Sequence, residues 1–292
     1  MSRRTTDHFC CIAQHSGPMP LSAVGVKGKY WEPGQDISIG FLEGTPDQLD
    51  LVRRVATTWT QFANLSFRFT DHPTEAHYSP VRIAFRAGNG SWSYIGTDCR
   101  MASAGRPTMN FGWLDEAVVL HEFGHMLGLG HEHQNPNSPI RWNKPQVYTD
   151  LGNAPNFWDH QTINHNIFAR YAPGAVDTSP LDKDSIMLYQ VPSRWTLDGF
   201  SAGFNTFISP TDTAFVRRIY PRPADEGTPE VATDQFRDWM AEVFVRHRDL
   251  VRLTEPVLVR MGQRLGVATH SSRLKAENID LIVKALQITS HA

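Results

Sequence analysis

Residues 121–132 read His-Glu-Phe-Gly-His-Met-Leu-Gly-Leu-Gly-His-Glu, which contains the pattern H-E-x-x-H-x-x-G-x-x-H. On a helix, His121 and His125 lie about one turn apart, so both imidazoles project from one face and reach the same ion. Glu122 is turned off that face and can hold a water molecule against a metal without occupying a ligand position. The stretch therefore predicts a helix that carries a metal on one face.

The second half of the stretch offers a third ligand. Gly128 can adopt the left-handed conformation that ends a helix, and the chain then doubles back so that His131 supplies another nitrogen. Three neutral histidines leave the fourth position of a zinc ion open for water, as in catalytic sites. Two other interpretations are a core helix with chance histidines and a metal-binding protein without activity. The full spacing argues against the first, and Glu122 argues against the second.

The motif as extended by His131 resembles the metzincin metalloproteases, in which a methionine-containing turn follows downstream. Residues 184–189 read Asp-Ser-Ile-Met-Leu-Tyr, similar to the S-x-M-H-Y Met-turn of the astacin family. The resemblance implies that Met187 forms a soft floor under the metal and that Tyr189 stabilises the oxyanion of the scissile carbonyl. Leu188 stands where the family usually has histidine, a position that does not bind the metal.

The resemblance implies a zinc-dependent endopeptidase with one Zn²⁺ per chain and Glu122 as general base. It also implies that Glu132, directly after the third histidine, is a buried anchor that meets a new amino terminus in matured members of the family. A chain that stays whole must give Glu132 another partner. The alternative function is a zinc-containing pseudoprotease or effector module that acts through protein binding by its C-terminal helical segment.

The resemblance runs from about residue 29 to residue 221 and implies an α+β fold. We expect a metzincin-like domain with a twisted, mixed, mostly parallel sheet, a zinc helix, and an irregular lower subdomain beneath the cleft. Alternation, turn signals and capping patterns predict the elements. Strands are expected at residues 36–42, 66–70, 81–86, 90–96 and 108–112, and helices at residues 45–65, from Asp115 through the zinc motif, and at 209–220.

The stretch from Ser91 to Gly96 is similar to the edge strand above the family's cleft, where a protein or peptide substrate adds as an antiparallel strand. Its aromatic residues are equally consistent with sheet packing, and both interpretations can hold. Shortly after Tyr189 comes Arg194, where the resemblance implies a basic residue that can select an acidic substrate side chain. The alternative is a solvated surface arginine. His133, His160 and His165 are expected to be surface residues or hydrogen-bonding members of the fold rather than ligands.

Cysteine usage argues against a disulfide framework. The chain has three cysteines, Cys10, Cys11 and Cys99, and adjacent cysteines rarely pair. Secreted astacins carry a disulfide from the edge strand, but Ser91 stands at that position and the partner near residues 111–113 is absent. This pattern is consistent with a reducing compartment or a microbial protein.

The N-terminal residues 1–29 pose a question of latency. Metzincins are often inhibited by a segment that places a thiolate or carboxylate on the open metal position. Cys10, Cys11 and Asp7 have the chemistry for this, since zinc binds thiolates well. The alternative is that both cysteines are small hydrophobic residues in a strand-like stretch.

The composition limits the class of protein. The chain has 292 residues, a net charge of −2 and 40% hydrophobic residues, which favours a globular protein without an electrostatic surface for nucleic acid. No signal peptide or membrane-spanning run is recognised, so we expect a cytoplasmic protein or one exported without a cleaved signal. Three segments are expected: an extension at residues 1–29, a catalytic domain at 30–223 and a helical segment at 224–292. The last either packs on the catalytic domain or binds a partner.

Overall fold

The computed structural model describes residues 11–12, 25–154, 156–172, 174–177 and 180–222. All of these belong to the first of two compact units, which ends at Arg222. The helical segment expected at 224–292 lies outside the described residues, as do Asp7 and Cys10. In the part of the chain that is described, no helix has the length and apolar character needed to cross a bilayer.

A six-stranded mixed sheet forms the upper part of this unit, with the strand order β1-β5-β6-β4-β2-β3. All neighbouring strands run parallel except β5 and β6, which are antiparallel. The strands are β1 (Cys11–Ile12), β2 (Asp36–Phe41), β3 (Ser66–Thr70), β4 (Val81–Ala84), β5 (Trp92–Ser93) and β6 (Met109–Asn110). The expected twisted, mostly parallel sheet is therefore present.

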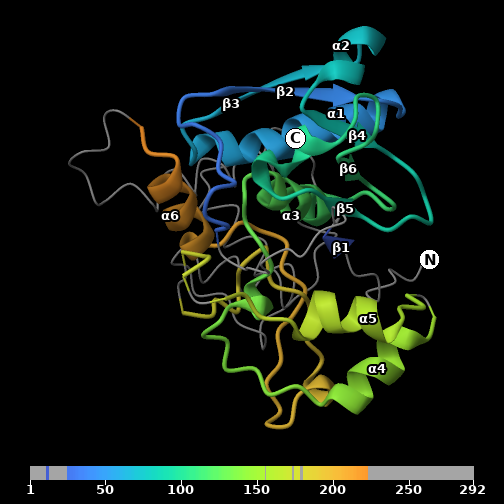
Figure 1. Cartoon of the computed structure of the whole chain (residues 1–292), viewed down its shortest axis with the longest axis vertical. Helices are drawn as coiled ribbons and strands as arrows, with labels where there is room; N and C mark the ends of the chain where they lie inside the picture. Colours follow the sequence, from blue (N-terminus) through green and yellow to red (C-terminus); the bar gives the residue numbers. More distant parts are fainter. Residues whose placement is uncertain (1–10, 13–24, 155, 173, 178–179, 223–292) are drawn as a thin grey trace, which may run out of the picture. The chain divides into compact units, whose positions relative to one another are not determined.

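Helices cover both faces of this sheet. Helices α1 (Pro46–Ala56) and α3 (Glu116–Met126) pack against each other beneath β2 and β3, and α2 (Pro73–Tyr78) lies on the other side of β2 (Figure 1). The capping box predicted at Thr45 begins α1. Helix α2 approaches β2 closely because Gly40 has no side chain, and a Cβ there would collide with the backbone of Ala76.

The lower part contains more helix than expected. Helix α4 (Lys144–Gly152) and helix α5 (His160–Ile163) are separated by a loop, and α5 continues into a π-helical turn, Asn164–Phe168 (Figure 1). These helices were missed because their apolar pattern is weak. Helix α4, for example, buries only Val147 and Leu151. The final helix, α6 (Pro210–Ile219), begins at a capping box on Ser209 as predicted.

Two other boundaries differ from the sequence prediction. The helix expected to reach residue 65 ends at Ala56 and continues as a 3-10 helix, Thr57–Gln61. Threonine hydroxyls there bond to backbone carbonyls, which competes with regular helix. Strand β5 is shorter than expected because Gly90 and Gly96, with φ of 67° and 51°, turn the chain on either side of it.

Of the three cysteines, for which no disulfide framework was expected, the structure describes the side chain of Cys99. Cys99 is a free, buried thiol. Ser91 bridges the same two segments that the family's disulfide would join, because its hydroxyl accepts from Gly112 N–H at 3.1 Å and donates to Trp113 O at 3.3 Å. A hydrogen-bonded serine therefore stands between the edge strand and the loop before α3.

Candidate active site

The three histidines of the motif converge on one point. One ring nitrogen from each of His121, His125 and His131 lies within 4.8 Å of the other two, and all three residues are buried. The Nε2 atoms of His125 and His131 are 3.1 Å apart. A tetrahedral zinc ion with bonds of about 2.1 Å needs nitrogen atoms about 3.4 Å apart. The 3.1 Å between the His125 and His131 nitrogens is close to that spacing, so this pair can share one ion.

The first two ligands are oriented by backbone carbonyls. His121 Nδ1 lies 2.7 Å from Ile186 O, and His125 Nδ1 lies 2.7 Å from Leu129 O. A carbonyl oxygen only accepts, so each Nδ1 carries the hydrogen. Each Nε2 is then left with its lone pair directed into the site, as a metal ligand requires.

The turn at the end of α3 makes the contact to Leu129 O possible. Gly128, with φ of 92°, donates to His125 O at 2.8 Å, and Leu129 N–H donates to Gly124 O at 3.0 Å. This pair of bonds is the Schellman ending of a helix, which favours glycine at the left-handed position. The predicted reversal at Gly128 is therefore present and places a carbonyl on the second histidine.

Burial keeps the three histidines neutral. It lowers the pKa of His121 to about 4 and lowers the pKa values of His125 and His131 well below their ordinary range. Neutral imidazole is the form that binds a metal, so none of the three has to lose a proton when the ion arrives at neutral pH. Glu122, which follows His121 on α3, is fully buried beside them.

The Met-turn lies directly against the zinc helix. Met187 is buried, and a Cβ at Gly124 would collide with its sulfur atom. The close approach therefore depends on glycine at the second variable position of H-E-x-x-H. Tyr189 packs on the ligand set as well, with its ring centroid 4.2 Å from that of His131 and 6.0 Å from that of His121.

Helix α6 holds the Met-turn through hydrogen bonds. The Asp212 carboxylate accepts hydrogen bonds from Ser185 Oγ at 2.7 Å and from Ile186 N–H at 2.9 Å, while it also completes the capping box with Ser209. Because Ile186 O receives the His121 hydrogen, Asp212 is linked to His121 through the backbone of a single residue, Ile186.

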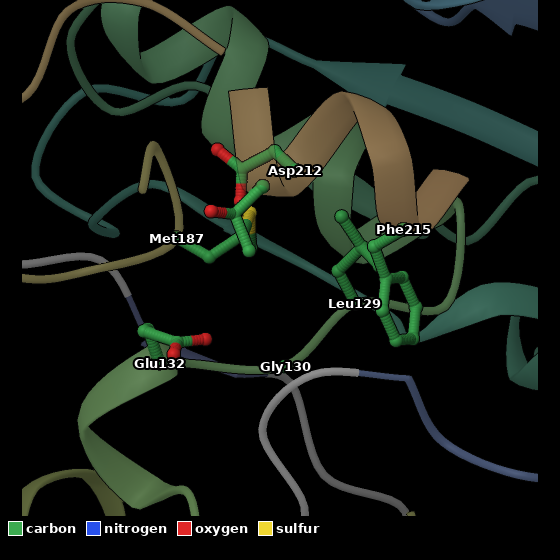
Figure 2. A pocket seen from close by; sticks show the side chains of 7 residues that line it. Leu129, Gly130, Glu132, Met187, Asp212 and Phe215 are labelled. Carbon is green, nitrogen blue, oxygen red and sulfur yellow. The ribbon is translucent and has the colours of Figure 1, made fainter. Parts of the chain in front are cut away.

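Glu132 lines a small pocket next to the Met-turn. The pocket encloses about 280 Å³, including space open to solvent, between Leu129, Glu132, Met187 and Asp212, and Figure 2 shows Glu132 and Asp212 on opposite sides of it. Glu132 Oε1 accepts from Asp182 N–H at 3.0 Å, which is a partner that the sequence did not predict. Burial raises the pKa of Glu132 to about 8.

Comparison with known proteins identifies the family. The model of the peptidase family Astacin matches residues 24–194, more than half of the chain. The chain belongs to the astacin family. Its fold is similar to that of the solved structure of myroilysin, with 37% identity and a TM-score of 0.64 over 68% of this chain and 98% of that one.

Two curated relatives match over part of their length. Protein SpAN of Strongylocentrotus purpuratus is 29% identical over 193 residues, which are 59% of this chain and 28% of that protein. Zinc metalloproteinase nas-39 of Caenorhabditis elegans is 26% identical over 216 residues, 72% of this chain and 19% of that protein. The chain thus spans well under half the length of these relatives. The α+β metzincin fold and zinc as the astacin cofactor are confirmed at the level of the family.

The remaining candidates of this astacin-family chain fall in different places. Arg194 is exposed and forms an ion pair with Asp150 of α4, 2.7 Å from Nε to Oδ2. Cys11 contributes its backbone to β1, which pairs in parallel with Trp92 and Ser93 of β5. The roles of Arg194 in specificity and of the cysteines in inhibition stay predictions.

Three residues around the astacin site were not recognised in the sequence as contributors to it: Gly124, Gln134 and Asp212. Gly124 makes room for Met187, and Asp212 was predicted only as part of a helix start. Gln134 Oε1 lies 3.3 Å from His131 Nδ1. In the sequence, the only sign of this contact was the spacing of three residues from His131 to Gln134. That spacing brings the two side chains together only if the chain forms a tight turn there.

Proposed function

We propose that this chain is a zinc-dependent endopeptidase that hydrolyses peptide bonds with water. The observation that carries this proposal is the convergence of three neutral, Nδ1-anchored histidines beside a buried glutamate. A bound zinc ion supplies Lewis acidity and makes water a stronger acid. His121, His125 and His131 would hold that ion, and their number leaves one position open for water or substrate.

Glu122 moves the proton in this proposal. It follows His121 on α3, so it lies beside the ligands without competing for the metal. As general base, Glu122 takes a proton from the attacking water and later delivers it to the leaving amine. Its full burial supports this role, because a carboxylate removed from bulk water interacts more strongly with charge that develops next to it.

Tyr189 assists at the carbonyl oxygen. Its ring packs against His131, which supports a role for this side chain at the site. As a hydrogen-bond donor, it stabilises negative charge on the scissile carbonyl oxygen in the transition state. Met187 and Gly128 support the site by packing and by chain reversal, and Glu132 supports it as a buried anchor.

The N-terminal extension is proposed to hold the enzyme latent. Strand β1 (Cys11–Ile12) pairs with β5, the strand along which a substrate is expected to add. A substrate that adds as an antiparallel strand needs the same backbone groups of Trp92 and Ser93. Because β1 runs parallel to β5, it occupies that edge in the opposite direction. Removal of residues 1–29 should therefore raise activity on an unfolded protein, and equal rates before and after removal would contradict latency.

The proposed function is tested by measuring the zinc content of the protein together with its cleavage of casein. We expect one zinc per chain and chelator-sensitive cleavage of casein, both before and after removal of residues 1–29. Glu122→Gln should keep the zinc and lose turnover by about 10²–10⁴-fold. The matched control is Glu116→Gln, since Glu116 lies at the start of the same helix in an ion pair with Arg54.

Two results would overturn the proposal. Undiminished, chelator-sensitive cleavage by the Glu122→Gln variant would exclude Glu122 as the general base. One zinc per chain without cleavage, even after removal of residues 1–29, would favour the alternative of a zinc-containing effector module.

A further inference from the structure

The third zinc ligand is followed by a turn that places a glutamine on top of it. Residues Glu132–Gln134 form a 3-10 helix that follows His131, and Gln134 N–H donates to His131 O at 3.1 Å. In a 3-10 helix, side chains three residues apart lie above one another. Gln134 therefore stands over His131, with its Oε1 atom 3.3 Å from Nδ1 of the imidazole. Both residues are fully buried, so bulk water does not replace this contact.

The other end of the Gln134 amide is bound to the π-helical turn Asn164–Phe168. Gln134 Nε2 donates to His165 O at 2.7 Å, and the neighbouring His133 Nε2 donates to Asn166 O at 2.7 Å. The backbone takes part as well, because Tyr171 N–H donates to Gln134 O at 3.2 Å. Three hydrogen bonds thus join the segment after the third ligand to this turn and the residues that follow it.

The carbonyls of His165 and Asn166 are available to side chains because the π-helical turn ends after them. Its own bond runs from Ala169 N–H to Asn164 O at 2.8 Å, and the next N–H groups of the chain leave the helix. Tyr171, for example, donates to Gln134 rather than back to Asn166. The carbonyls of His165 and Asn166 accept from side chains of the metal-site segment instead, as carbonyls at helix ends commonly do.

These contacts fix which ring nitrogen of His131 carries hydrogen. A backbone carbonyl only accepts, so the atom of Gln134 that faces His165 O is the amide nitrogen. The amide oxygen then faces His131, and an amide oxygen also only accepts. Nδ1 of His131 must therefore be the donor, which leaves the Nε2 lone pair for the metal.

The other two ligands do not use such a relay. Backbone carbonyls accept directly from Nδ1 of His121 and His125, whereas His131 depends on a side chain whose own orientation is set by the π-helical turn. We propose that Gln134 is a positioning residue that fixes the tautomer of His131 and thereby sets zinc affinity. This inference deepens the proposed function, because it concerns the metal site of the same reaction.

The experiment measures zinc affinity by competition with a chelator in the full-length protein. Gln134→Met keeps the length of the side chain and removes both polar atoms. We expect it to weaken zinc binding by about 10–100-fold, the usual cost of losing an outer hydrogen-bond partner of a metal ligand. Gln134→Glu, as a buried protonated carboxyl, keeps an oxygen toward His131 and an O–H donor toward His165 O, so it should bind zinc more tightly than the methionine variant. The cobalt-substituted Gln134→Met protein should also show altered absorption bands.

A matched control tests the π-helical turn itself. Asn166→Ala removes the bond from Asn166 Nδ2 to Thr162 O at 3.0 Å but leaves both carbonyls that receive His133 and Gln134. We expect this variant to lose some thermal stability and to keep the zinc affinity of the unchanged protein.

The position of the ring hydrogen on His131 can be measured in the unchanged protein, so this test does not depend on a variant that folds. Nitrogen-15 NMR of the zinc-free protein should show hydrogen on Nδ1 of His131. Hydrogen on Nε2 would overturn the proposal, and so would wild-type zinc affinity in Gln134→Met or equal weakening in both Gln134 variants. No substrate is used, so the protease mechanism can fail while this inference stands, and the reverse is equally possible.

Discussion

The upper and lower regions of the described unit hold the three histidines of the site by different means. In the upper region, His121 and His125 lie on α3, where every residue from 117 to 126 is buried and the apolar ones belong to the main core. In the lower region, His131 lies in an irregular segment that is held by hydrogen bonds from side chains to backbone. One site is therefore built from a packed helix on one side and a polar network on the other.

The two constructions respond differently to change. The helix gains from many small contacts, and its last carbonyls are satisfied by buried aromatic side chains, since Trp31 Nε1–H donates to Met126 O at 2.8 Å and Tyr220 OH donates to Leu127 O at 2.7 Å. A network of directed bonds depends on each member, because loss of one partner leaves a buried polar group unsatisfied at about 1–3 kcal/mol. The upper region should tolerate single changes better than the lower region does.

The Met-turn joins the two regions. Its Ile186 carbonyl accepts from His121 of the upper region, while Asp212 of α6 accepts from the Ser185 hydroxyl and the Ile186 N–H. Met187 lies on Gly124 of the zinc helix. Substitutions at the Met-turn and in the regions on either side of it therefore test whether the packed upper region and the hydrogen-bonded lower region respond differently.

Among the changes that test this comparison, the largest effect is expected at Tyr189 in the lower region. Tyr189→Phe removes the proposed donor to the carbonyl oxygen and should lower kcat/KM by about 10²-fold, at the low end for loss of one such donor. Zinc content and thermal stability should stay near those of the unchanged protein, because the ring that packs on His131 is kept. Peptide cleavage rates and metal analysis measure both quantities. A loss of zinc together with activity would show that the lower network holds the metal through Tyr189.

A smaller effect, on stability, is expected at the junction. Gly124→Ala places a methyl group against the Met187 sulfur, and overpacking of this kind costs about 1–3 kcal/mol of unfolding free energy. Denaturant unfolding of the zinc-free protein measures it. Gly152→Ala is the matched control, since a Cβ there meets only Trp158 O at 3.8 Å. Equal stability of the two variants would mean that Met187 moves aside freely and that the junction is loose.

The smallest effect is expected at Arg194. Its ion pair with Asp150 is exposed on the arginine side, and exposed pairs contribute about 0–1 kcal/mol. Arg194→Ala should therefore change stability little and leave cleavage of neutral peptides close to the original rate. Rates for matched peptides with glutamate or glutamine after the scissile bond decide its role. A selective loss on the glutamate peptide supports acid recognition, whereas equal rates leave Arg194 as a surface residue.

Much of the upper region follows from local sequence. The first four residues of strand β2 alternate in burial, the starts of α1, α3 and α6 carry side-chain caps, and Gly128 takes the left-handed conformation. These features depend on near neighbours in the chain, so their patterns can be recognised without tertiary information. Helices α4 and α5 escaped prediction because they are short, and packing rather than periodicity stabilises such helices.

The sequence by itself determined which atoms can bind zinc, because the spacing of His121 and His125 on a helix and the reversal at Gly128 are local properties of the chain. Only the tertiary structure decided how those atoms are oriented. Ile186 O, far along the chain, receives the ring hydrogen of His121, and Asp182 N–H became the partner of Glu132. His165 O, in a distant turn, orients the Gln134 amide that faces His131. Contacts over such separations depend on chain packing and on hydrogen-bond direction, which residue spacing does not encode.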